Sequence, residues 1–278
     1  MVLEKKPDLK EIVKRVEQNE SSPMPMEMRL KLVRDIMGLR IDQPAEYAII
    51  TGCRSPYSFK HLAYFGALLD YLGTSYTLLS TETCCGESFI QHVDHKAPEE
   101  EATYEAFSRQ LSAKNIERIR KLGINKIITL CAGCMTRYSH MWGDSGMEIL
   151  YYPQYLLPRL EGMHLEVEVN YYEGCHSHHR TPKYQIDTKT SKELIGKVEG
   201  LTVTKTIPNY CCRNLAEKIF AASDRPVIVT PTSCCASILP QKRTAATPVV
   251  KQLTEVLCEA LGIQWTLDGR VTRKESHV

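Results

Sequence analysis

The sequence predicts an α/β protein of two pseudo-symmetric halves, with cysteine clusters at the carboxyl ends of the strands and a helical extension at the N-terminus. Short apolar, β-branched runs alternate with helical patterns along most of the 278 residues, as in parallel sheets with crossover helices. A lone cysteine, an adjacent cysteine pair and a closing cysteine group occur once in each half. We therefore expect the extension at 1–46, the first half at 47–164 and the second half at 165–278.

The N-terminal extension contains two helical patterns. A breaker at 21–25, made of serine, proline and methionine, separates them. Apolar residues lie on one face of each helix: Leu9, Ile12, Val13 and Val16 in the first, and Leu30, Leu32, Val33 and Ile36 in the second. An amphipathic segment of this kind can pack on the protein's own core or dock on a neighbouring subunit.

The first half alternates strands and helices. Its expected strands are 47–51, 76–79 and 124–130, and each leads to a cysteine. The first intervening helix has apolar residues spaced by three and four positions and ends at Gly73, a residue type that commonly terminates helices. The second helix begins at Pro98, has an acidic first turn that the helix dipole favours, and ends at Gly123.

The second half repeats this plan in a shorter form. Its expected strands are 165–171, 201–207 and 226–230, and its expected helices carry the apolar groups at 194–198, 215–220 and 249–261. In open α/β sheets, ligands bind at the carboxyl ends of the strands, so cysteines that are distant in sequence are expected to converge there. Two such edges that face each other would place both cysteine sites near the junction of the halves.

The composition is that of an ordinary globular protein, with 43% hydrophobic and 24% charged residues. A net charge of +2 gives no electrostatic basis for nucleic acid or an anionic membrane as the main partner. We find no apolar run long enough to span a bilayer and no apolar core of an export signal, so we expect a cytoplasmic protein without a transmembrane segment. Neither the glycine-rich dinucleotide fingerprint nor a P-loop occurs, and no nucleotide or flavin is expected in this chain.

Eleven cysteines in reducing cytoplasm favour metal ligation over disulfides, and adjacent cysteines fit disulfide geometry poorly. Thiolates are the usual ligands of iron–sulfur clusters and also suit zinc. Structural zinc sites draw on two short pairs, whereas only Cys131 and Cys134 have that spacing in a half with five cysteines. Iron–sulfur clusters are favoured, with zinc and buried inert thiols as alternatives. The inert interpretation suits Cys258, which lies in an apolar helical stretch.

Ten cysteines occur at matched offsets and carry a resemblance to a known family. The first set is Cys53, Cys84, Cys85, Cys131 and Cys134, and the second is Cys175, Cys211, Cys212, Cys234 and Cys235. This arrangement resembles the cysteine-rich CCG-domain family, whose duplicated motif is a lone Cys, then Cys-Cys-Gly, then C-x-x-C. Members that it looks like include the B-type subunits of heterodisulfide reductase and of the sulfur-oxidising heterodisulfide-reductase-like complex. The resemblance covers nearly the whole chain beyond the extension.

The resemblance implies two [4Fe-4S] clusters that cleave or form a disulfide, the first of the noncubane type. The first set matches a complete motif, with Gly86 after the pair. The second matches four of five positions: Cys175, Cys211, Cys212 and Cys235. Thr232 stands where the first cysteine of C-x-x-C belongs, Cys234 falls at a spacer position, and Arg213 replaces the glycine. The second site is interpreted as a cluster of altered ligation that uses Cys234, with an ordinary cubane or a degenerate site as the alternatives.

The same resemblance implies the B-type catalytic subunit of a heterodisulfide-reductase-like complex, and the incomplete second motif favours a role in sulfur oxidation. Its partners would be an iron–sulfur electron-transfer subunit (C-type) and a flavoprotein subunit (A-type). A thiol or disulfide substrate, free or carrier-bound, would bind between the halves. The alternatives are heterodisulfide reduction of the methanogen type, an electron-transfer or anchoring subunit of a succinate or fumarate oxidoreductase, and a zinc-stabilised interaction module.

Few other residues suggest chemistry. His176, directly after Cys175, is a candidate proton donor to a leaving thiolate, with an exposed basic loop as the alternative. Arg54 and Arg180 could neutralise cluster charge or bind a carboxylate, unless they are solvated surface residues. The histidines at 61, 92, 95, 140 and 164 show no partner spacing and receive no role. The cysteine groups stand farther apart in the first half than in the second, which indicates an acidic helical insertion near residues 90 to 105.

Overall fold

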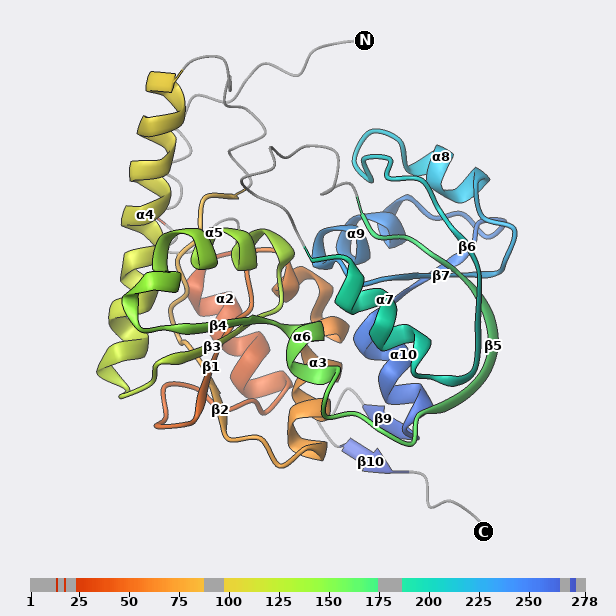
Figure 1. Ribbon diagram of the computed structural model, residues 1–278, viewed down its shortest axis with the longest axis horizontal. Coiled ribbons are helices and arrows are strands. Elements are labelled where there is room, and N and C mark those ends of the chain that lie inside the picture. The colour runs from red at the N-terminus through yellow and green to blue at the C-terminus, as the bar shows by residue number, and fades with distance from the viewer. Residues whose placement is uncertain are drawn as a thin grey trace.

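The computed structural model describes residues 24–87, 98–174, 187–265 and 271–273, together with Lys14 and Gln18. Two four-stranded parallel sheets form its centre, one in each half of the chain (Figure 1). The predicted α/β fold, with two similar halves and a helical N-terminal segment, is confirmed. The first helix predicted in the extension lies outside the described residues, apart from Lys14.

The first sheet has the strand order β2-β1-β3-β4, and every neighbouring pair is parallel. Its strands are β1 Tyr47–Ile50, β2 Tyr76–Leu78, β3 Lys126–Thr129 and β4 Glu148–Tyr151. All four residues of β1 are buried. This agrees with its continuous apolar run, which is typical of strands inside parallel sheets.

The second sheet repeats this order as β6-β5-β7-β8, again with parallel neighbours. Its strands are β5 His164–Tyr171, β6 Glu199–Thr206, β7 Val227–Thr230 and β8 Val249–Gln252. The position of β1 in the first sheet thus corresponds to that of β5 in the second, and β3 corresponds to β7. Because the strands of each sheet are parallel, all their carboxyl ends lie at one edge.

The sequence analysis missed the fourth strand of each sheet, and its assignment of Val249 to a helix was wrong. Val249 lies on β8, paired with Val227 of β7, and the helix that follows begins only at Leu253. Each fourth strand has four residues and runs directly into a helix, α6 after β4 and α10 after β8. So short a strand cannot be separated from the adjoining helical pattern by periodicity alone.

Helices connect the strands and cover the sheets (Figure 1). The two longest, α3 Phe59–Tyr71 and α4 Pro98–Lys121, were both predicted. The others are α2 Met26–Leu30, the π-helix η1 Lys31–Ile36, η2 Ser55–Ser58, α5 Ala132–Trp142, η4 Gly143–Ser145, α6 Tyr152–Leu156, α7 Lys189–Gly196, α8 Ala216–Ala221, α9 Ser233–Ile238, η7 Leu239–Lys242 and α10 Leu253–Ala260. The strands β9 Ile263–Trp265 and β10 Val271–Arg273 form an antiparallel pair. No helix among the described residues combines the length and the apolar character needed to cross a bilayer.

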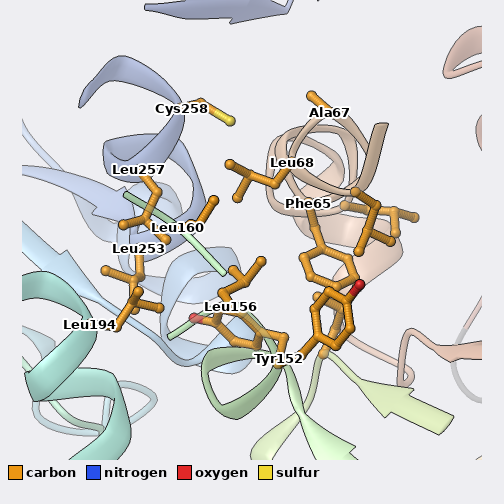
Figure 2. Packing of buried hydrophobic residues seen from close by; sticks show 14 of the residues in the cluster. Phe65, Ala67, Leu68, Tyr152, Leu156, Leu160, Leu194, Leu253, Leu257 and Cys258 are labelled. Atoms are coloured by element: carbon orange, nitrogen blue, oxygen red, sulfur yellow. The ribbon is translucent and has the colours of Figure 1, made fainter. Parts of the chain in front are cut away.

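One apolar cluster joins the two halves. Figure 2 shows Phe65 and Leu68 of α3 on one side, Leu253 and Leu257 of α10 on the other, and Tyr152 of α6 below them. Each of these side chains is at most 1% exposed. Their burial removes a large apolar surface from water and stabilises the association of the halves.

The same cluster includes Cys258 (Figure 2). This side chain is fully buried, and its thiol donates to the backbone carbonyl of Tyr64. The prediction that Cys258 is a core residue is confirmed. Each sheet lies within one predicted half while the core is shared, so the domain boundaries at residues 47 and 165 stay a prediction.

The described part of the N-terminal extension packs on the protein itself. α2 and η1 form one continuous helical stretch, as predicted for this segment. Val33 is fully buried in the shared core, and Arg29 is only 1% exposed. Ile41 then forms a parallel bridge with Leu78 of β2, which joins the extension to the edge of the first sheet.

Candidate metal centre

All five cysteines of the first half meet at the carboxyl edge of the first sheet. The Sγ atoms of Cys85 and Cys134 are 3.4 Å apart. The neighbouring thiols of Cys53 and Cys85 raise the pKa of Cys84, and the thiol of Cys131 raises the pKa of Cys134, so these side chains also lie close to one another. A continuous series of thiols therefore joins three segments that are far apart in the sequence, as predicted.

The crowding of these buried thiols shifts their pKa values in opposite directions. Hydrogen bonding to Cys53 and Cys85, followed by burial, holds the pKa of Cys84 well above its usual value. Hydrogen bonding to Cys134 lowers the pKa of Cys85 well below it. Hydrogen bonding to Cys134 also lowers the pKa of Cys131. The set thus favours thiolates at some positions, and the thiolate is the form that binds metal.

Glycine is required at position 52 for this convergence. Gly52 has a φ of 74°, a conformation that other residues rarely adopt. A Cβ at this position would lie 2.7 Å from the Cβ of Cys131 and 3.2 Å from the Sγ of Cys134. The absence of a side chain therefore lets the segment of Cys53 approach the start of α5 closely.

The buried carboxylate of Glu82 fixes the backbone before Cys53. Glu82 is 5% exposed and accepts the backbone N–H groups of Thr51 at 2.9 Å and Gly52 at 2.6 Å. Arg29 of α2 donates to the same carboxylate at 2.9 Å. Charge-assisted hydrogen bonds of this kind are strong and directional. The sequence analysis missed both residues, because their partners are backbone and side-chain groups about 30 to 50 residues away in the sequence.

One face of α4 holds the segment that carries the cysteine pair. Asn115 accepts the backbone N–H of Thr83 at 2.8 Å and donates to its carbonyl at 2.7 Å. The hydroxyl of Ser108 donates to the carbonyl of Cys85. Gly86 has a φ of 83°, and a Cβ there would lie 3.1 Å from the Ser108 hydroxyl. Helix α4 thus positions the first site, whereas much of the insertion predicted near residues 90 to 105 lies outside the described part.

A buried cation lies beside the first set of thiols. Arg137, three residues after Cys134 on α5, is fully buried, and its Nε donates to Glu87 at 2.6 Å. Its guanidinium also lies over the ring of Tyr104, 4.8 Å from the centroid. After hydrogen bonding to Cys134, this positive charge also contributes to the lowered pKa of Cys85. The Arg137–Glu87 pair therefore lies beside the site, and its positive member favours the thiolate form of Cys85.

Four cysteines of the second half gather at the edge of the second sheet, and Cys175 lies outside the described residues. The Sγ atoms of Cys212 and Cys234 are 4.0 Å apart. Cys212 is also in hydrogen-bonding contact with Cys235. Cys212 and Cys235 are buried, whereas Cys211 and Cys234 are partly exposed.

Thr232 occupies the structural position of Cys131. Cys131 is the N-cap of α5, with φ and ψ of −106° and 125°, and Thr232 is the N-cap of α9, with −98° and 117°. The Thr232 hydroxyl donates to the carbonyl of Glu173 at 3.0 Å. The alignment inferred from the sequence agrees with this geometry, and a hydroxyl stands where the first site has a thiol.

Gly174 repeats the role of Gly52. Its φ is 93°, and a Cβ there would lie 2.6 Å from the hydroxyl of Thr232 and 3.4 Å from the Sγ of Cys235. This corresponds to the approach of Gly52 to the first site. Cys235 is therefore the counterpart of Cys134, and Cys234 is an additional thiol at the spacer position.

The second cysteine pair also differs in its backbone. Gly86 has a positive φ, whereas Arg213 does not, since Asp42 is the sole non-glycine residue with positive φ in the described ranges. Arg213 is exposed, and the six-residue α8 stands where the first half has the 24-residue α4. The second pair consequently lacks the close packing that Ser108 provides in the first half.

The two cysteine sites meet at the junction of the halves. The hydroxyl of Ser233, next to Cys234, donates to the carbonyl of Leu130 at 3.0 Å. In the opposite direction, the hydroxyls of Tyr151 and Tyr152 donate to the carbonyl of Pro231 at 3.1 and 2.9 Å. The predicted placement of both sites near the junction is confirmed.

His61, which received no role from the sequence, also crosses this junction. It is fully buried on α3, and its Nδ1 lies 2.9 Å from the hydroxyl of Thr254 on α10. Burial lowers the pKa of His61 to about 3, so the ring is neutral at physiological pH. Its Nε2 lies 3.5 Å from the side-chain amide of Gln252, also from the second half. The position of His61 in the sequence gave no signal, because its side-chain partners belong to the second half of the chain.

Two arginines lie close to the second site. Hydrogen bonding to Cys212 and burial raise the pKa of Cys234 well above its usual value, and the charges of Arg213 and Arg54 oppose this increase. Arg54 follows Cys53, so it lies between the two sets of thiols. His176 and Arg180 lie outside the described residues, and their predicted roles stay predictions.

A cavity of about 350 Å³ opens along the same junction. Its lining includes Phe59 and His61 from the first half and Ser237, Val250 and Gln252 from the second. Ser237 lies on α9, and its hydroxyl donates to the carbonyl of Cys234 at 3.0 Å. The cavity therefore adjoins the helix that carries two cysteines of the second site.

The donor set fits an iron–sulfur group. Both sites offer converging thiols, and the first adds a buried cation that compensates thiolate charge. Within the described ranges, no group of three or more His, Cys, Asp or Glu side chains has the geometry of a site for a single metal ion. The fit therefore depends on the chemistry and convergence of the thiols. At the second site, the hydroxyl of Thr232 removes one thiolate from the set.

Comparison with protein families identifies the first cysteine segment. Residues 47–137 match the family model described as a cysteine-rich domain, CCG. This segment contains all five cysteines of the first set, so the expected resemblance is confirmed for it. Over these residues the chain is similar to a CCG cysteine-rich domain.

Curated relatives were found among methanogens. The D subunit of dihydromethanophenazine:CoB–CoM heterodisulfide reductase from Methanosarcina barkeri is 26% identical over 155 residues, 50% of this chain and 35% of the relative. An uncharacterized iron-sulfur protein from Methanococcus maripaludis is 24% identical over 168 residues, 59% of this chain and 31% of the relative. The aligned part of the chain thus spans about a third of the length of these relatives.

Among solved structures, an aspartate racemase homologue from Pyrococcus horikoshii OT3 is similar over 77% of this chain and 96% of its own. Its sequence identity is 12% and its TM-score is 0.31. A likeness of this size carries no argument about function.

Proposed function

We propose that this chain is the B-type catalytic subunit of a heterodisulfide-reductase-like complex and performs thiol/disulfide redox chemistry in cytoplasmic sulfur oxidation. The convergence of five thiols within the segment that matches the CCG domain carries the proposal. The names of the relatives, a heterodisulfide reductase subunit and an iron-sulfur protein, support it. Because those relatives extend well beyond the aligned part, the activity and the complex are both part of the proposal.

Two [4Fe-4S] clusters belong to this proposal, held by the cysteines of the two sites. The first, of the noncubane type, is assigned to Cys53, Cys84, Cys85, Cys131 and Cys134. The second, of altered ligation, is assigned to Cys175, Cys211, Cys212, Cys234 and Cys235. When bound, such a group supplies electrons and an iron that can take a substrate sulfur. The chain's thiols match this need in type and in number.

The chain's own residues prepare the sites for a sulfur substrate. Cys53 and Cys131 are the partly exposed members of the first set, which leaves that site open on their side. Arg54 lies between the two sets and can attract an anionic group of a substrate. The cavity at the junction provides space beside α9 for the body of such a molecule. His176 remains the candidate proton donor to the leaving thiolate.

The proposed direction is argued from the departures in the second site, and the proposed partners from the resemblance to heterodisulfide-reductase-like complexes. With Thr232 in place of a cysteine, the two sites cannot be identical, and a sulfur-oxidising role suits this asymmetry better than a symmetric heterodisulfide reductase does. Electrons would pass to or from a C-type iron–sulfur subunit linked to an A-type flavoprotein. A carrier-bound thiol is the preferred substrate class.

An anaerobic turnover assay tests the proposal. The purified protein, reduced with dithionite and freed of excess reductant, is mixed with oxidised 2-mercaptoethanol, cystine and other small disulfides. Cleavage of each S–S bond consumes two electrons and two protons and releases two thiols, so thiol release is expected to match cluster reoxidation. Clusters that reoxidise with an artificial acceptor but release no thiol from any disulfide would indicate an electron-transfer subunit. Zinc without acid-labile sulfide would indicate an interaction module.

A further inference from the structure

A single serine hydroxyl connects the backbones of the two cysteine sites. Ser233 lies between Thr232 and Cys234 at the start of α9 and is 1% exposed. Its hydroxyl donates to the carbonyl of Leu130, the residue before Cys131, at 3.0 Å. The peptide group next to one ligand of the first site is thus joined to the residue next to a ligand of the second.

The Ser233 hydroxyl both donates and accepts a hydrogen bond, and these bonds hold it in place. The hydroxyl of Ser55, itself fully buried, donates to the Ser233 oxygen at 3.3 Å. Nearby, the two ring nitrogens of His61 contact side chains of the second half, Nδ1 the hydroxyl of Thr254 at 2.9 Å and Nε2 the amide of Gln252 at 3.5 Å. A buried polar network of this kind is stable only when each member has a partner, and it then specifies one arrangement of the groups it joins.

The contact is reciprocal, yet its chemistry differs between the halves. Pro231 is the counterpart of Leu130, and its carbonyl accepts the hydroxyls of Tyr151 and Tyr152 from the first half. The counterpart of Ser233 in the first half is Ala132, which has no hydroxyl and is 2% exposed. Pseudo-symmetric packing alone would not require a serine at 233, because an alanine fits the equivalent position.

We propose that Ser233 is a positioning residue that couples the two cysteine sites and provides the hydrogen-bonded route by which an electron passes between their clusters. The inference rests on the proposed function, because it requires a cluster at each site. With a cluster bound at each site, the electron given up by the reduced one would be taken up by the oxidised one. No bond is formed or broken, and no proton is transferred. The partner subunit supplies the electron in the complex.

Rapid mixing of the oxidised, anaerobically purified protein with dithionite, followed by freeze-quench electron paramagnetic resonance, tests this inference. Ser233→Ala is expected to keep its iron and to slow, by several-fold, the reduction of whichever cluster is reduced second. Thr136→Ala is the matched control, since it removes a buried hydroxyl from α5, the counterpart of α9, where it donates to the carbonyl of Ala132 in the same helix. Ser233→Thr keeps a hydroxyl and is expected to restore the rate.

The possible results separate this inference from the proposed function. Two clusters that reduce in Ser233→Ala at the rates of Thr136→Ala would overturn the inference alone. Iron sufficient for one cluster would also overturn it, whereas a protein without iron would refute the proposed function too. If Ser233→Ala loses its iron, Tyr152→Phe is measured instead, because it removes one of the two hydroxyls that bond to Pro231. An unchanged rate of reduction of the second cluster in Tyr152→Phe would contradict the coupling.

Discussion

The first and second cysteine sites stand on sheets of the same strand order but are built differently. The first has five described thiols, a glycine after its cysteine pair and the long helix α4 packed against that pair. The second has Thr232 at a ligand position, Arg213 after its pair and only the short helix α8. The comparison shows that the fold brings cysteines together in both halves, whereas the local residues decide which ligand set results.

Loss of one ligand from the first site has the largest expected effect. Cys84 belongs to the adjacent pair and is 5% exposed. Cys84→Ser is expected to abolish the signal of the first cluster in electron paramagnetic resonance and to leave that of the second. Cys258→Ala is the control, because this thiol is equally buried but lies in the apolar core. An unchanged spectrum for Cys84→Ser would remove Cys84 from the ligand set.

The next largest effect is expected when the second site receives the thiol that it lacks relative to the first. Thr232→Cys restores the missing thiol at a position whose backbone already matches that of Cys131. We expect the second cluster to acquire the spectral type of the first and to be retained at lower iron concentrations. Thr136→Cys, on α5 outside the ligand positions, is the control. A second cluster with an unaltered spectrum in Thr232→Cys would show that more than this residue separates the two sites.

Loss of the Glu82 carboxylate is expected to lower the free energy of unfolding. Glu82→Gln leaves the buried guanidinium of Arg29 without its carboxylate, and breaking such a pair costs about 3–5 kcal/mol of unfolding free energy. Chemical denaturation under anaerobic conditions measures this loss. Glu117→Gln, in the exposed pair with Lys121, is expected to leave the stability unchanged. Equal stability of the two variants would contradict a structural role for Glu82.

The smallest effect concerns the junction that both sites share. The pKa of His61 is about 3 in the folded protein against 6.5 as its ordinary value, because burial disfavours the charged ring. Protonation therefore favours the unfolded chain, and the stability contributed by neutral His61 is present above about pH 6.5 and is lost as the pH falls toward 3. His61→Gln is expected to lose less stability between pH 7 and pH 5, measured by thermal unfolding. Parallel pH profiles for the variant and the parent would contradict this.

Much of the fold could be predicted because its signals are local. The runs of apolar residues at β1, β3 and β7 and the capped pattern of α4 are visible in any short window of the sequence. β4 and β8 escaped prediction because each merges with the helix that follows it. The error at Val249 has the same cause, since a four-residue strand and the first turn of a helix share an apolar pattern.

The site was predictable only in part. Cysteines at matched offsets identified the two sets, and the strand ends indicated where they would meet. Glu82, Asn115 and Ser233 could not be found in this way, because their function depends on backbone groups from segments up to a hundred residues distant. A polar residue that satisfies a distant peptide group leaves no periodic signal. Such partners become visible only when the chain is folded.

Quantification of iron and acid-labile sulfide in anaerobically purified protein tests the central claim most directly. If the thiols of both sites hold [4Fe-4S] clusters, the brown protein will contain about eight iron and eight sulfide per chain, in line with four of each per cluster. A colourless protein with neither iron nor sulfide would contradict the account. About four of each would restrict it to the first site.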